Sequence, residues 1–171
     1  MAMAGVYRIR PATMEDSPGI RCLRNAAVQE SLAIWTSIEQ DPVQAEAWLA
    51  PMVQRGTALV AHVDGKPQEI VGFAVAGVWH SYEGYARTVE DSIYLSPAVQ
   101  GRGLGSRLLA ALIEASRAAG DRTMIALIEA GNIASVHLHE RYGFNIVGTV
   151  PQAGEKFGQL LDLTIMSRSL H

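Results

Sequence analysis

A glycine-rich segment, Gly101-Arg102-Gly103-Leu104-Gly105, lies between a β-like run and a clearly helical one. Because glycine has no side chain, its backbone N–H groups can approach a ligand closely, and a helix N-terminus adds a partial charge that favours an anion. Arg102 and Arg107 could add cationic contacts to the same anion. The segment therefore favours a phosphate or pyrophosphate site, with a turn that only lets strand and helix pack as the alternative.

Two familiar nucleotide motifs do not fit the spacing of this segment. A dinucleotide fingerprint starting at Gly101 requires glycine at position 106, which is Ser106 here. A P-loop requires glycine at 106 and lysine at 107, and the chain has Ser106 and Arg107. The phosphate of some other ligand is therefore expected.

Glu90 lies in the β-like run that leads into the glycine segment. In an extended strand three polar side chains share its face: Thr88, Ser92 and Tyr94. An acid midway along a central strand is seldom solvated on either side, so a functional carboxylate at Glu90 is favoured, with an ordinary solvated strand face as the alternative. Asp91 points to the opposite face, and we do not expect it to replace Glu90.

Other catalytic arrangements are disfavoured. His137 and His139 diverge by about 200° on a helix, and no Cys or acidic residue completes a set at zinc spacing, so we expect no metal. No G-x-S-x-G nucleophile elbow occurs. The single cysteine, Cys22, lies in a helix-like stretch and is expected to be an inert core thiol.

Hydrophobic periodicity predicts the elements that position these groups. Strands are expected at 7–10, 57–63, 70–79, 87–95, 123–129, 144–150 and 159–170. Helices are expected from a cap at Thr13 through Val28, from Pro42 to Gly56 with a possible kink at Pro51, from Gly103 to Gly120, and from Asn132 to Gly143. This order, β-α-α-β-β-β-α-β-α-β-β, predicts a mixed α/β sheet with β-α-β crossovers in its later part.

Composition limits the class of protein. The chain has 171 residues, of which 49% are hydrophobic and 18% charged, with a net charge of −3. We expect one domain, 1–171, with no basic field for nucleic acid or anionic membrane. The start, residues 1–10, lacks an apolar run of signal-peptide length, and no run approaches the roughly 18–20 residues of a membrane span. One cysteine fits a reducing compartment, so a cytoplasmic protein is expected.

Gln100-Gly101-Arg102-Gly103-Leu104-Gly105 matches the Q/R-x-x-G-x-G/A acetyl-CoA motif of the GNAT N-acetyltransferase superfamily. The chain also resembles the subgroup of phosphinothricin and methionine sulfoximine/sulfone N-acetyltransferases. The segments that carry this narrower resemblance are "AIW" (33–35), W-x5-Y-x2-TVE (79–90), "SIYL", "IEAGNIAS", "LHERYGF" and "PQAGEKFGQLLDLT".

The resemblance implies a GNAT fold, acetyl-CoA as co-substrate, a small amino-acid-like amine as acceptor, direct transfer in a ternary complex, and a homodimer. Glu90 occupies the position of the proposed base. His139 stands where many members have a tyrosine that protonates the leaving thiolate, so it is an acid or a second base. Acetylation of another amine (a protein N-terminus, a polyamine or an antibiotic) and a non-catalytic acetyl-CoA sensor are the alternatives.

The same resemblance implies the binding residues. The cofactor contacts are Ile93, Tyr94, Leu95, Gln100, Gly101, Arg102, Gly103, Leu104, Gly105, Ser106, Asn132 and Arg141. A bulge at Tyr94–Leu95 would offer backbone N–H groups to the thioester. The substrate contacts are Trp35, Glu83, Gly84, Tyr85 and Tyr142. Lys156 could meet a substrate carboxylate, but an exposed turn lysine is the preferred interpretation.

Overall fold

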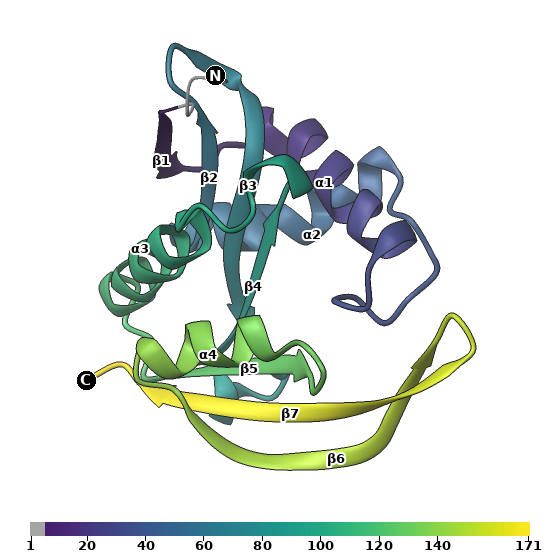
Figure 1. Ribbon diagram of the computed structural model, residues 1–171. Helices are drawn as coiled ribbons and strands as arrows, with labels where there is room; N and C mark the ends of the chain where they lie inside the picture. Colours follow the sequence, from purple (N-terminus) through teal and green to yellow (C-terminus); the bar gives the residue numbers. More distant parts are fainter. Residues whose placement is uncertain (1–5) are drawn as a thin grey trace.

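The computed structural model describes residues 6–171, so part of the expectation for the chain start, that on residues 1–5, lies outside the described residues. Figure 1 shows one twisted sheet with helices on both faces. The strands are β1 (Tyr7–Pro11), β2 (Ala58–Val63), β3 (Lys66–Val78), β4 (Thr88–Leu95), β5 (Thr123–Glu129), β6 (Asn145–Lys156) and β7 (Gln159–Ser169). The helices are α1 (Ser17–Glu30), α2 (Pro42–Arg55), α3 (Leu104–Ala118) and α4 (Ile133–Arg141), with 3-10 turns at Met14–Asp16, Glu83–Tyr85 and Pro97–Val99.

Local chemistry explains the helix ends. Asp41 caps α2, its carboxylate accepting from the Gln44 backbone N–H at 2.8 Å, and Pro42 takes the first helical position, where its missing N–H costs nothing. The helix continues through Pro51 and ends at Gly56, whose φ of 75° is left-handed. The predicted order of strands and helices is confirmed.

The sheet has the order β1-β2-β3-β4-β5-β7-β6. Neighbouring strands are antiparallel except β4 and β5, which are parallel and are joined by the α3 crossover. The predicted mixed α/β sheet of the GNAT fold is therefore confirmed. No helix within residues 6–171 is long and apolar enough to cross a membrane.

Two apolar cores lie on opposite faces of the sheet. One joins α3 and α4 to the sheet through residues such as Leu108, Leu112 and Met124, and the other joins α1 and α2 through Leu49 and Phe73. Tyr94 packs against the α1–α2 core, whereas Ile93 and Leu95 pack against the α3–α4 core. Successive side chains of β4 therefore pack on opposite faces of the sheet, as the period-2 pattern predicts.

One expectation for the core is wrong. Cys22 is exposed on α1 and not buried as an inert core thiol. The helical face of α1 that is buried instead carries Ile20 and Val28. These two residues are spaced so that Cys22 falls outside the buried stripe.

Candidate active site

The site forms where β4 and β5 separate. The two strands pair only over Thr88–Glu90 of β4, which lie opposite Thr123–Ile125 of β5. Beyond Glu90 they diverge, and a cavity of about 1010 Å³ opens between them. Leu127 of β5 lines this opening and is 38% exposed.

Beyond Glu90, the edge of β4 that faces the cavity has no β5 partner for its backbone groups. The Trp79 N–H donates to Thr88 O and the Ser96 N–H to Val71 O, each at 2.9 Å, so even-numbered residues of β4 bond toward β3. The N–H groups of Ile93 and Leu95 therefore point to the side that β5 has left.

This geometry corrects the expected bulge at Tyr94–Leu95. The ladder between β3 and β4 runs without a register shift from Val78↔Val89 to Gly72↔Leu95. The opening arises because β5 diverges, and Tyr94 keeps its N–H on the β3 side. The available donors are therefore Ile93 and Leu95, and the Gln100 side chain donates to the Leu95 carbonyl at 3.3 Å.

The glycine segment forms a cradle at the N-terminus of α3. Gly101 and Gly103 have left-handed φ angles of 70° and 76°, and a Cβ at either would meet nothing within 4 Å. The Arg107 N–H makes the first helical bond, to Gly103 O at 3.2 Å, which leaves the N–H groups of Leu104, Gly105 and Ser106 without helical partners. Bare backbone, open space and free amides fit a phosphate-bearing ligand.

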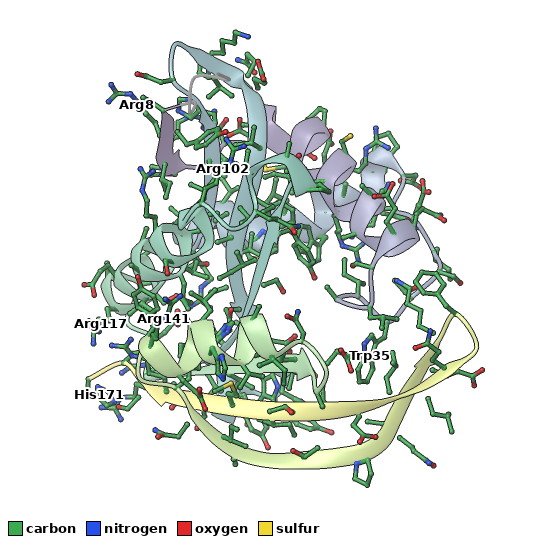
Figure 2. The ribbon with its side chains drawn as sticks, in the orientation of Figure 1. Arg8, Trp35, Arg102, Arg117, Arg141 and His171 are labelled. Carbon is green, nitrogen blue, oxygen red and sulfur yellow. The ribbon has the colours of Figure 1, made fainter. Side chains whose placement is uncertain are left out.

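Other predicted cofactor residues lie around this cradle. Asn132 caps α4, its side-chain oxygen accepting from the Ser135 N–H at 3.1 Å, and it lines the cavity. Arg141 donates to Ser106 Oγ at 3.4 Å and so joins α4 to the first turn of α3. Figure 2 labels Arg141 near α4 and Arg102 near the start of α3. Arg102 does not line the cavity.

Arg107 does not add to the anion site as expected. Its guanidinium donates to the Tyr7 carbonyl of β1 at 3.0 Å. The Arg107 side chain therefore reaches the edge strand β1 and not the cradle. The cation that faces the cavity from this side is Arg141.

Glu90 is half-buried and lines the cavity. Burial raises the pKa of Glu90, and the neighbouring charge of Asp91 raises it further. Burial also raises the pKa of Tyr94, on the same face, to about 12, so that phenol stays protonated. Glu90 is thus the group on this face that can accept a proton near neutral pH.

Asp91 and His139 form a buried pair on the opposite face, 7% and 4% exposed. His139 Nδ1 lies 2.7 Å from the Ser135 carbonyl, which can only accept, so Nδ1 carries a proton. Nε2 lies 3.1 Å from Asp91 Oδ2. Burial alone lowers the pKa of His139, but the Asp91 hydrogen bond and charge, with the Ser135 carbonyl, outweigh it and raise that pKa.

Sequence reasoning missed the role of Asp91. It placed the side chain correctly on the face opposite Glu90, but did not connect it to His139, which comes 48 residues later and is buried beside it. The available signal was an acid in a row that is otherwise apolar: Val89, Ile93 and Leu95. His137, by contrast, is exposed, as the divergence of the two histidines predicts.

The predicted substrate residues are not all brought together. Trp35 lines the cavity, whereas Glu83, Gly84, Tyr85 and Tyr142 do not. The segment Glu83–Tyr85 precedes the first residue of β4, at the end where β4 is still paired with β5, so it lies away from the opening. Tyr142 follows α4 and packs against the α3–α4 core.

Lys156 is not the exposed turn lysine that was preferred. It is 6% exposed, and its Nζ donates to Ser31 O at 2.7 Å and to Ile34 O at 2.6 Å. Burial lowers the pKa of Lys156. The lysine lies at the end of β6, where the hairpin meets the segment after α1, and not in the exposed turn itself.

Comparison with known proteins identifies the family. The family model described as "Acetyltransferase (GNAT) family" matches residues 23–144. The chain belongs to the GNAT acetyltransferase family. This match covers most of the chain and includes β4, the glycine cradle, α3 and α4, so this GNAT chain is an acetyltransferase by family as well as by fold.

Individual relatives agree with this assignment. An L-methionine sulfoximine/L-methionine sulfone acetyltransferase from Pseudomonas aeruginosa is 43% identical over 162 residues, covering 95% of this chain and 94% of the relative. A phosphinothricin N-acetyltransferase from Streptomyces coelicolor is 34% identical, covering 95% and 96%. The protein yncA from Salmonella typhimurium, solved with its cofactor acetyl-CoA, has a TM-score of 0.91 and 38% identity, covering 97% and 95%.

The Asp91–His139 pair predicts a titration. In the native protein His139 is expected to titrate above the ordinary histidine value of about 6.5, whereas in Asp91→Asn its pKa should fall, because the hydrogen bond and charge of Asp91 no longer oppose the effect of burial. Since the folded pKa exceeds the unfolded one, the stability that the pair contributes is present below about pH 6.5 and is lost as pH rises through the folded pKa.

NMR of the imidazole resonances measures this titration directly. Asp64→Asn, which removes an exposed carboxylate paired with Arg8, is the control and should leave His139 unchanged. An unchanged His139 titration in Asp91→Asn would contradict the assignment of Asp91 as the group that raises the pKa.

Proposed function

We propose that this GNAT acetyltransferase moves the acetyl group of acetyl-CoA to the α-amine of a small amino-acid-like substrate such as methionine sulfone, methionine sulfoximine or phosphinothricin. The observation that carries the chemistry is the placement of Glu90, the free β4 edge and the α3 cradle around one cavity. The substrate class is supported by relatives that match along nearly their whole length.

Glu90 is the proposed base. Free amines are mostly protonated at neutral pH, so the nucleophile must lose a proton before it attacks. Because the pKa of Glu90 is raised, it lies closer to the pH at which the enzyme works, as general-base catalysis favours. Glu90 accepts the proton directly or through a water molecule.

The free N–H groups of Ile93 and Leu95 are the proposed donors to the thioester oxygen. They are fixed by the β3–β4 ladder before any ligand arrives, so no reorganisation is needed as charge develops. The free amides of Leu104–Ser106, with Arg141, would hold the phosphates of acetyl-CoA, and Asn132 would contact its pantetheine arm.

His139 is the proposed acid. Its raised pKa keeps a proton available for the leaving thiolate. Both ring nitrogens are hydrogen-bonded, so His139 delivers a proton only by exchanging its Asp91 bond for one to sulfur. Transfer is proposed to be direct, because Cys22 lies on α1 and does not line the cavity that would hold an acyl-enzyme. A single domain, a homodimer and a cytoplasmic location also remain proposals.

A panel of amines tests the function. Release of free CoA thiol from acetyl-CoA should be accelerated by methionine sulfone, methionine sulfoximine and phosphinothricin, and much less by polyamines, aminoglycosides or a peptide N-terminus. If acetyl-CoA binds but no amine accelerates release, the chain is a sensor and the enzyme proposal fails. If a polyamine or peptide is preferred, the substrate class is wrong while the chemistry stands.

Substitution of the base gives a second test. Glu90→Gln should lower kcat by about 10²–10⁴-fold with little change in acetyl-CoA affinity, because only proton removal is lost. The native kcat/KM should fall at low pH as Glu90 becomes protonated, with an apparent pKa above the ordinary glutamate value of about 4.3. Glu90→Gln should lack this fall. Glu69→Gln, an exposed glutamate paired with Lys66, is the matched control. Native turnover in Glu90→Gln at neutral pH would remove Glu90 from the mechanism.

A further inference from the structure

The segment that follows α1 borders the cavity on the side of the base. Glu90 shares its β4 face with Tyr94, which packs on the α1–α2 core. Trp35 and its neighbours Ala33 and Ile34 line the cavity from this segment. Trp35 therefore lines the cavity on the Glu90 side of β4, whereas the cradle at the start of α3 lies on the other wall.

The tip of the β6–β7 hairpin reaches this segment from the far end of the sequence. In Figure 1 the hairpin curves up toward the connection between α1 and α2, and Figure 2 shows Trp35 between the two. The bend has a local cause: Val150 faces Leu163 and Gly154 faces Leu161, so β6 advances four positions while β7 advances two.

Gly154 gives the Trp35 ring its space. A Cβ at Gly154 would lie 2.2 Å from Trp35 Cε3 and 2.7 Å from Cζ3, which no side chain can occupy while the ring stays. The φ of Gly154 is not in the left-handed region, so the backbone alone does not require glycine here. The requirement comes from the ring, which is also fixed at its other end by Nε1, donating to Leu32 O at 2.8 Å.

Lys156 fixes the backbone on either side of Leu32, whose carbonyl accepts the hydrogen bond from Trp35. Its ammonium donates to Ser31 O and Ile34 O, two carbonyls of one short segment, and it is almost fully buried. Burying a lysine is unfavourable unless such bonds offset the lost hydration, and charge-assisted bonds are the strong ones. The lysine therefore holds the Ser31–Ile34 segment against the hairpin.

We propose that Gly154 and Lys156 are positioning residues that set amine selectivity by holding Trp35 as a fixed wall of the amine end of the cavity. This proposal rests on the proposed function for its choice of substrate. A wall held at a fixed place limits the length and bulk of the acceptor's side chain, whereas acetyl-CoA, bound at α3, does not depend on it.

Kinetics with a matched glycine pair test the wall. Gly154→Ala should raise KM for methionine sulfone at least about tenfold, the scale of one misplaced methylene, and leave KM for acetyl-CoA within about twofold. Gly148→Ala, on the same strand with nothing within 4 Å of its added Cβ, should change neither value. In a Trp35→Ala background Gly154→Ala should raise KM no further, because the ring it displaces is gone. Equal changes in both KM values, or none, would overturn the proposal.

Hydrogen exchange gives a readout that does not need a substrate. Lys156→Met should speed amide exchange across residues 31–38 and leave α3 unchanged, while Lys66→Met, at an exposed lysine, should have no effect there. If no amine is acetylated by the native enzyme, the proposed function fails but this result still stands. Unchanged exchange over 31–38 in Lys156→Met would overturn the positioning role itself.

Discussion

The separation of β4 from β5 after Glu90 is the constraint on which the rest of the site depends. Parallel strands that stayed paired would bury every backbone group between them, and no ligand could reach the sheet. Because β5 diverges after its third pairing, the N–H groups of Ile93 and Leu95 face a cavity instead of a strand. The α3 cradle then starts close to this edge, tied to it by the Gln100–Leu95 hydrogen bond.

The two adjacent acids of β4 acquire different tasks from the same constraint. Alternation along the strand sends Glu90 toward α1 and Asp91 toward α4, so the pair cannot share a proton. Asp91 meets His139 in a buried pair, and its charge contributes to the raised pKa of Glu90. One strand thus supplies the proposed base, the proposed oxyanion donors and the partner of the proposed acid, while both apolar cores keep it in place.

Local patterns predicted the strands, helices and caps because each depends on near neighbours in sequence. Gly56 and Asn132 are examples, since a left-handed C-terminus and an N-cap can be seen within four residues. What failed depended on distant contacts. The partner of Asp91 is 48 residues away, the carbonyls held by Lys156 are more than 120 residues away, and the Tyr7 carbonyl bound by Arg107 is 100 residues away. A local periodicity cannot predict contacts between residues so far apart in the sequence. The expectation that Glu83–Tyr85 lines the substrate site depended on which end of β4 is open, and the sequence does not show this.

The most direct test of this account is the response of individual backbone amides to acetyl-CoA. In ¹H–¹⁵N spectra the account predicts that acetyl-CoA shifts the amide signals of Ile93 and Leu95 together with those of Leu104–Ser106, and that Tyr94, bonded toward β3, responds far less. Free CoA, which lacks the thioester, should shift the α3 amides but leave Ile93 and Leu95 close to their unbound positions. Saturating acetyl-CoA that moves the α3 amides and leaves Ile93 and Leu95 unmoved would contradict the claim that the free edge of β4 receives the thioester.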